Sequence, residues 1–181
     1  MKKKLLVILL TVLMLFSSVS PALVSADPLE TDGNDIRVMG WNLLNTPGVI
    51  NNWEEYFTVN KRGERTVDII GRYDADSIGF QEGNLSWKNF LNVNLTDYTI
   101  VPATQRFTDP IYYRQDRLDL VDSGVFWLSA TPDVPSKQSD AAEERVCTWA
   151  IFRNKATGVM YAHFNTHLVM SATKQERPVC A

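Results

Sequence analysis

The stretch Ser77-Ile78-Gly79-Phe80-Gln81-Glu82 is a short, largely apolar run that ends in a carboxylate. Its length and composition are typical of a buried strand. Alternation along such a strand places Ile78, Phe80 and Glu82 on one face. A buried carboxylate is unfavourable unless it is paired or binds a metal ion, so Glu82 is a candidate ligand for a hard cation. A glutamate that leaves the core and is solvated explains the same pattern, and spacing alone favours that simpler interpretation.

A second apolar run, residues 36–43, ends in a similar way. Its alternation places Asn42 at the end of the face that begins with Ile36. Both faces of this run are apolar, which predicts a strand buried between a sheet partner and another layer. Asn42 could offer a neutral oxygen to a cation held by Glu82. The alternative is that Asn42 caps the turn that follows.

The rest of the sequence predicts two surface helices followed mainly by strands. Helices are expected over residues 60–73 and 85–91, where apolar residues gather on one side of the helical wheel. Enrichment in β-branched and aromatic residues predicts five further strands. They are expected at residues 98–101, 111–114, 119–128, 146–152 and 159–168. A hairpin connection at 153–158 and a loop at 131–144 complete the pattern, which indicates an α+β layered domain.

The last predicted strand, residues 159–168, carries both histidines of the sequence. Tyr161, His163, Asn165 and His167 share one of its faces. An Asn and a His two residues apart could orient a phosphoryl oxygen and protonate a leaving group, so Asn165 and His167 are candidate catalytic residues. His163 lies deeper in the strand and is predicted to be a hydrogen-bonded structural residue. A catalytic and a structural role fit His167 equally well, because it lies where the strand meets a loop.

Three further residues could hold a phosphate group. Tyr113 and Arg114 offer a hydroxyl and a guanidinium, and Arg145 offers a second guanidinium. Packing of an aromatic strand beside a solvated charge explains them as well. The sequence has no Gly-x-Ser-x-Gly elbow, no phosphate-binding Gly-x-x-x-x-Gly-Lys-Ser/Thr loop, no His-Glu-x-x-His and no paired Cys-x-x-Cys. Enzyme classes whose mechanisms need those motifs are therefore excluded.

The first 26 residues have the pattern of a secretory signal peptide. Three lysines precede an apolar run over residues 5–16, and small residues occupy the cleavage position at Ala26. A retained membrane anchor is the alternative, but the run is short for a bilayer. We therefore expect a signal peptide at 1–26, a flexible leader at 27–34 and a domain at 35–181. The protein would be secreted or extracytoplasmic, without a stable membrane anchor.

The composition is that of an ordinary globular domain. The chain has 181 residues, 45% of them hydrophobic, and 18 Lys and Arg against 21 Asp and Glu. Loss of the three N-terminal lysines would leave 15 basic residues against 21 acidic ones and a net charge of −6, which disfavours a broad polyanion-binding surface. Cys147 lies in an apolar stretch and is expected to be a buried free thiol, with a disulfide to Cys180 as the alternative.

Six segments occur in an order that resembles the endonuclease/exonuclease/phosphatase superfamily. They are Ile36–Asn42, Ala75–Glu82, Tyr112–Leu118, Asp122–Ser129, Arg145–Ala150 and Phe164–Leu168. The resemblance covers residues 35 to 168. It implies a deoxyribonuclease I-like, four-layered α/β sandwich in which two mixed sheets lie face to face with helices outside.

The resemblance also implies roles for particular residues. Glu82 becomes the principal carboxylate of a Mg²⁺ or Mn²⁺ site at one edge of the sandwich, with Asn42 as its neighbour. Asn165 and His167 become phosphate-orienting and acid-type catalytic groups. The implied reaction is hydrolysis of a phosphate ester in a nucleic acid, a phospholipid headgroup or a sugar phosphate, with no obligate protein partner.

Two later segments of the family pattern, Gly-Asp-x-Asn and Ser-Asp-His, do not occur in this sequence. Ser139-Asp140 is followed by Ala141, and Val169 stands where the family usually has Asp. The sequence therefore predicts the N-terminal portion of such a domain, incomplete at its C-terminus. Because catalytic residues act as a unit, we expect a metal-dependent phosphoesterase of doubtful activity. The alternative is a catalytically inactive exported fragment that acts as a binding module.

Overall fold

The computed structural model describes residues 35–44, 59–102, 109–139 and 141–168. The predicted signal peptide and leader, and Cys180, lie outside these residues. Cys147 is buried, and burial raises the pKa of its thiol to about 11. No helix within the described ranges is long and apolar enough to cross a membrane.

The described residues form the helices and strands that the sequence predicts, with small shifts of the ends. In chain order they are β1 (Val38–Asn42), α2 (Val59–Tyr73), β2 (Ser77–Gln81), α3 (Leu85–Asn94), β3 (Tyr98–Ile100), β4 (Ile111–Arg114), β5 (Leu118–Trp127), β6 (Val146–Asn154) and β7 (Met160–Thr166). Asn84 caps α3, because its side chain accepts a hydrogen bond from the Trp87 backbone N–H.

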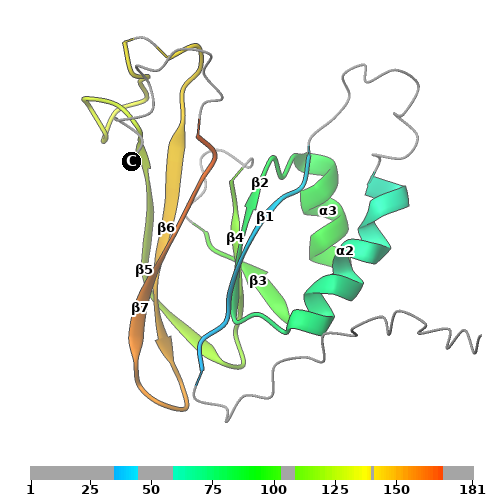
Figure 1. The fold of residues 1–181 in the computed structure, drawn as a ribbon. Coiled ribbons are helices and arrows are strands. Elements are labelled where there is room, and N and C mark those ends of the chain that lie inside the picture. Colours follow the sequence, from blue (N-terminus) through cyan, green and yellow to red (C-terminus); the bar gives the residue numbers. More distant parts are fainter. Residues whose placement is uncertain (1–34, 45–58, 103–108, 140, 169–181) are drawn as a thin grey trace, which may run out of the picture.

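These strands build two sheets that face each other. One has the order β1-β2-β4-β3 and the other the order β5-β6-β7. β1 runs parallel to β2, and the other strand pairs are antiparallel. Figure 1 shows both helices on the outer side of the four-stranded sheet. The predicted α+β sandwich is confirmed, and the described residues supply three of its implied layers.

A buried core joins the helices to the four-stranded sheet. Ile78 and Phe80 of β2 pack there with Ile70 of α2 and with Trp87 of α3. The helices cross closely at Gly63, where a Cβ atom would lie 2.4 Å from the ring of Phe90. Glycine at this position therefore allows the close contact between α2 and α3.

A second core fills the space between the two sheets. Phe152 of β6 is fully buried, with its ring 5.0 Å from that of Tyr113 and 5.5 Å from that of Tyr161. Ile111 and Leu118 belong to the same cluster. Tyr113 is thus part of the core that holds the sheets together.

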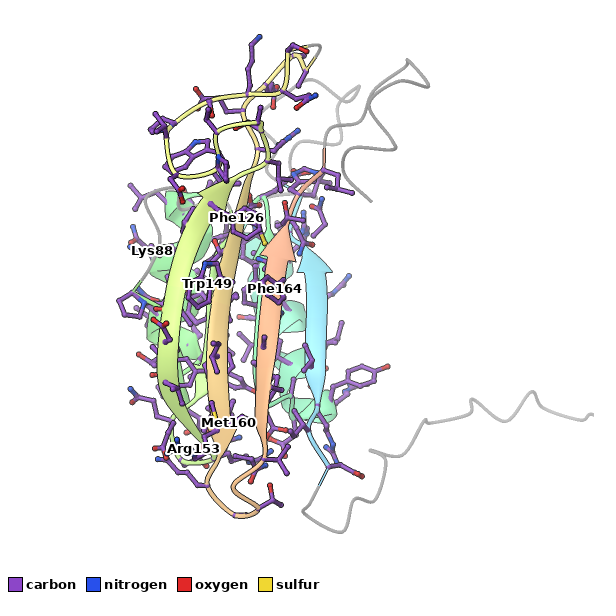
Figure 2. The ribbon with its side chains drawn as sticks, turned by 90° about the vertical axis from the view of Figure 1, so that its left-hand side faces the viewer. Lys88, Phe126, Trp149, Arg153, Met160 and Phe164 are labelled. Carbon is purple, nitrogen blue, oxygen red and sulfur yellow. The ribbon has the colours of Figure 1, made fainter. Side chains whose placement is uncertain are left out.

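The outer face of the three-stranded sheet carries large apolar side chains that are exposed or half-buried. Figure 2 shows Phe126, Trp149 and Phe164 on this face, one from each strand. The indole of Trp149 covers Gly124, where a Cβ atom would lie 2.7 Å from the ring. Phe164 is 61% exposed. No helix within the described residues covers this face.

The prediction that β1 is buried between a sheet partner and another layer is wrong. β1 is an edge strand that pairs only with β2 within the described residues. Val38 is 53% exposed, whereas Met39 and Trp41 pack against the helix-side core. An apolar edge strand has the same residue pattern as a central one, so the pattern alone predicts the wrong burial.

The prediction that His163 is structural is confirmed. The side chain is 6% exposed, and its Nδ1 lies 2.9 Å from the Ser77 hydroxyl oxygen of the facing sheet. That oxygen also accepts a hydrogen bond from the Tyr161 hydroxyl at 3.0 Å. Burial lowers the pKa of His163 from 6.5 to about 4, because the interior disfavours the imidazolium ion.

This burial predicts a loss of stability in acid. Between pH 6.5 and 4 the unfolded chain protonates His163 and the folded chain does not, so the free energy of unfolding falls as the pH falls. At about 1.4 kcal/mol per pKa unit, the His163 contribution reaches roughly 3 kcal/mol. Urea unfolding at pH 7 and pH 4.5 should therefore show a smaller acid loss in His163→Gln than in wild type. Equal losses in the two proteins would contradict this assignment.

Candidate active site

Three strands end at the same end of the sandwich and deliver polar side chains there. β1 and β2 are parallel, and Asn42 is the register partner of Gln81, so Asn42 and Glu82 leave adjacent strands at neighbouring positions. β7 of the facing sheet also ends there, at the top of Figure 1, and His167 follows it directly. The sheet topology therefore brings together residues that are far apart in sequence.

The side chains of Asn42, Glu82 and His167 meet at this end. Asn42 Nδ2 donates a hydrogen bond to Glu82 Oε1 at 3.0 Å. His167 Nε2 lies 3.7 Å from the same oxygen, and the two side chains are 28% and 23% exposed. They are therefore shielded by protein and still reachable from solvent. The three residues that the sequence analysis proposed around a cation lie together at one rim.

The backbone at Glu82 explains how its carboxylate reaches this place. Ile78 and Phe80 point into the helix-side core, and strict alternation would direct Glu82 there too. Glu82 instead has a positive φ of 59°, which ends the alternation. The prediction that Glu82 shares the apolar face of Ile78 and Phe80 is therefore wrong, and its role as a cation ligand stays a prediction.

Asn42 has a second contact that limits its role. Its Oδ1 accepts a hydrogen bond from the backbone N–H of Leu44 at 2.7 Å, while Nδ2 faces Glu82. The turn-capping role considered for Asn42 is thus present. In this arrangement Asn42 orients the Glu82 carboxylate, and its oxygen is directed to the backbone.

Arg62 is a neighbour of the site that the sequence analysis missed. Its guanidinium lies 5.2 Å from the ring of Trp87 and donates a hydrogen bond to the carbonyl of Leu43, just after β1. Burial lowers the pKa of Arg62, and the charge of Glu82 opposes that effect. Arg62 therefore places a positive charge near the carboxylate. On the helical wheel it has the appearance of an ordinary solvated arginine, so the sequence carries no signal for this role.

Asn165 does not lie open to a substrate. It is 4% exposed, and its Nδ2 donates to the carbonyls of Phe80 at 2.8 Å and Pro110 at 3.1 Å. Its Oδ1 accepts a hydrogen bond from Gln81 Nε2 at 2.5 Å. Both amide hydrogens are used by backbone carbonyls, so the expected direct contact with a phosphate is not supported.

Tyr113 and Arg114 lie at the opposite end of the sandwich. β4 runs antiparallel to β2, and Tyr113 is the register partner of Ser77, the first residue of β2. Arg114 forms salt bridges with Asp74 at 2.9 Å and Asp116 at 2.7 Å, and its hydrogen bond to Asp116 is the main cause of its raised pKa. The structure therefore does not bring Tyr113 and Arg114 to Glu82. Antiparallel pairing, which the sequence does not reveal, is the reason.

Arg145 does lie at the site end. Cys147 is the register partner of Thr166, so Arg145 precedes β6 near the end of β7. Its guanidinium forms a salt bridge with Glu143 at 3.2 Å, and its buried Nε has no hydrogen-bond partner within the described part of the chain. Arg145 is therefore the only one of the three suggested phosphate-holding residues that the structure leaves near His167.

An open cleft of about 500 Å³ separates β1 from β7 below this rim. Val38, Gly40 and Phe164 line it, together with Asn165 at its upper end. Its lining mixes apolar residues with the polar Gln81 and Thr166 and includes no acidic residue. The candidate catalytic side chains of Glu82 and His167 lie at the rim above the cleft.

Glu82 is the candidate carboxylate ligand for a divalent ion at this rim. The described residues contain no group of three or more His, Cys, Asp or Glu side chains placed to share a metal. Magnesium often binds through one or two carboxylates and keeps several waters. The partly exposed Glu82 carboxylate fits that mode of binding, with Asn42 holding it in place.

Comparison with solved structures identifies the class of fold. A mannosyl-6-phosphatase from Bacteroides thetaiotaomicron is 30% identical, with a TM-score of 0.70 over 80% of this chain and 55% of that one. An endonuclease/exonuclease/phosphatase family protein of the same species is 32% identical, with a TM-score of 0.65 over 74% and 51% of the two chains. A Bacteroides vulgatus endonuclease/exonuclease/phosphatase is 28% identical, with a TM-score of 0.65 over 74% and 52%.

These likenesses confirm the resemblance that the ordered sequence segments indicate. The described residues have the fold of the endonuclease/exonuclease/phosphatase family, and the chain spans about half the length of these three structures. No family model matches the sequence. No curated protein matches it either.

Proposed function

We propose that this chain carries the metal-binding part of a divalent-metal-dependent phosphoesterase. The supporting observation is that Asn42, Glu82 and His167 converge within hydrogen-bonding or near-contact distance at one rim. A carboxylate beside an imidazole can hold a hard cation next to a proton donor. That combination is what hydrolysis of a phosphate ester needs.

Each residue has a distinct role in the proposed mechanism. Glu82 would hold Mg²⁺ or Mn²⁺, and the ion would stabilise negative charge on the phosphoryl group. Asn42 fixes the rotamer of the Glu82 carboxylate through its 3.0 Å hydrogen bond. His167 in its protonated form would donate a proton to the leaving oxygen. Arg145 would pair with a phosphate oxygen after exchanging its exposed partner Glu143.

We propose a small phosphate monoester as the first substrate to test. The sequence carries a net charge of −3, which gives no broad electrostatic footprint for a long nucleic acid. The Bacteroides thetaiotaomicron relative is a mannosyl-6-phosphatase. Nucleic acids and phospholipid headgroups are the competing substrates, and the test must separate the three.

We also propose that the chain is exported, on the strength of the three lysines, the apolar run at 5–16 and the small residues before Asp27. The protein should therefore be purified from the extracytoplasmic fraction, where N-terminal sequencing locates the cleavage site. A mature chain that begins at Asp27 supports export, and a retained N-terminus argues against it.

The decisive assay measures phosphate release from mannose 6-phosphate, cleavage of a single-stranded oligonucleotide and headgroup release from phospholipid vesicles, each with Mg²⁺, Mn²⁺ or a chelator. We expect metal-stimulated phosphate release from the sugar phosphate. A chain that binds Mn²⁺ but turns over none of the three would overturn the enzymatic proposal. That result would instead favour a catalytically inactive exported binding module.

A further inference from the structure

The two sheets approach each other closely where Gly79 of β2 faces Asn165 of β7. A Cβ atom at Gly79 would lie 2.7 Å from both Cγ and Oδ1 of Asn165. Real Cβ contacts are not that short, so the Asn165 side chain occupies space that only glycine leaves. The absence of a side chain at position 79 is therefore what admits the amide between the sheets.

Hydrogen bonds then fix the Asn165 amide to β2 and to the residue before β4. Its Nδ2 donates to the carbonyls of Phe80 and Pro110, and the Pro110 carbonyl also accepts from the Phe80 backbone N–H at 2.9 Å. Its Oδ1 accepts from Gln81 Nε2, which also donates to the Gly79 carbonyl at 3.3 Å. One buried amide thus connects two backbone carbonyl groups and the Gln81 side chain across the sandwich, and Gln81 in turn bonds the Gly79 carbonyl.

We propose that Asn165 is a positioning residue that sets the spacing between Glu82 and His167, and that Gly79 is the glycine that admits it. Asn165 lies two residues before His167, and Gly79 lies three residues before Glu82. The C-terminal ends of β2 and β7 are therefore held relative to each other by the same buried contact. This inference rests on the proposed function, because the spacing matters only if Glu82 and His167 act together.

Loss of Asn165 should affect the position of the strand ends as well as stability. A misplacement of about 1 Å at an active site can cost about 100-fold in rate. Loss of the Asn165 amide would remove its hydrogen bond to the Phe80 carbonyl and leave the Pro110 carbonyl with the Phe80 N–H, and it would let the strand ends relax apart. The distance from Glu82 Oε1 to His167 Nε2, 3.7 Å in this structure, is the quantity that should change.

A metal-free measurement tests the inference directly. Crystal structures of wild type and Asn165→Ala should show the distance from Glu82 Oε1 to His167 Nε2 increasing by about 1 Å in the variant. Asn154→Ala is the matched control, because Asn154 is also a buried asparagine but caps the β6–β7 hairpin at the other end. An unchanged distance in Asn165→Ala, or the same change in Asn154→Ala, would overturn the inference.

A solution measurement adds the metal. The imidazole resonances of the two histidines can be assigned by the loss of one signal in His163→Gln. Mn²⁺ bound at Glu82 should broaden the His167 resonance in wild type and should broaden it measurably less in Asn165→Ala, because paramagnetic broadening falls steeply with distance. If wild type shows no broadening, the proposed function fails. The metal-free distances still decide the positioning inference.

A pair of substitutions keeps the test usable if one variant folds poorly. Gly79→Ala alone should displace Asn165, because the new methyl group would contact its amide. The same substitution should be much less disruptive in the Asn165→Ala background, where the space is vacant. We expect the double variant to recover stability relative to Gly79→Ala while keeping the enlarged separation between Glu82 and His167. Additive losses of stability in the double variant would show that the two residues do not act through contact.

Discussion

Replacement of Glu82 by Gln should lower the metal-stimulated rate of phosphate ester hydrolysis by at least about 100-fold. The substitution keeps the side-chain volume and an oxygen atom but removes the charge that a hard cation needs. Asn42 and His167 both approach Glu82 Oε1, so they lose their shared anionic partner. The measurement is the rate of phosphate release against Mn²⁺ concentration, with circular dichroism to confirm the fold.

Glu64→Gln is the matched control for this prediction. Glu64 is an exposed residue of α2, the same helix that carries Arg62, so its removal changes the net charge by the same amount without touching the rim. Metal stimulation should survive this change. If hydrolysis by Glu82→Gln still responds to Mn²⁺, Glu82 does not bind the metal, and the proposed mechanism is wrong.

The order of helices and strands could be predicted from sequence because each has a strong local signal. The wheel pattern at 60–73 and the short apolar run at 77–82 depend only on neighbouring residues. The burial of β1 could not be predicted from sequence, because it depends on which strands pair with β1. Val38 is apolar and yet 53% exposed, since β1 lies at an edge of the described sheet.

The candidate site also has features that could be predicted from the sequence and features that could not. Asn42 and Glu82 end two adjacent parallel strands, so their approach follows from that pairing. Glu82 and His167 follow strands of two facing sheets, so their approach was implied by the resemblance and not by strand pairing. The direction of the Glu82 side chain was not predictable, because it follows from a left-handed backbone at a single residue. The placement of Arg114 depends on an antiparallel register that alternation does not encode.

Asn165 shows why the role of a residue is harder to predict than its presence. Its partners Phe80 and Pro110 lie 85 and 55 residues away in sequence, on β2 and just before β4. The pattern Asn165-Thr166-His167 predicts a polar strand end and says nothing of what that asparagine will contact. The half-buried position of His167 and the buried one of Asn165 are a consequence of the facing sheet.

The inter-sheet core carries the largest expected effect on stability. Phe152 is fully buried between Tyr113 and Tyr161, which come from the two facing sheets, with ring centroids 5.0 and 5.5 Å away. Truncation to alanine would remove both ring contacts and leave a cavity. We expect Phe152→Ala to lower the free energy of unfolding by about 3 to 5 kcal/mol, measured by urea denaturation.

Phe164→Ala is the control that separates burial from residue type. Phe164 belongs to β7 of the same sheet but projects from its outer face and is 61% exposed, so its truncation should cost less than about 1 kcal/mol. Equal losses for the two variants would mean that the outer face is covered in solution and that Phe164 is buried there. A small loss for Phe152→Ala would mean that the sheets are not held together by this core, and the spacing of Glu82 and His167 would then lack the support on which the candidate site depends.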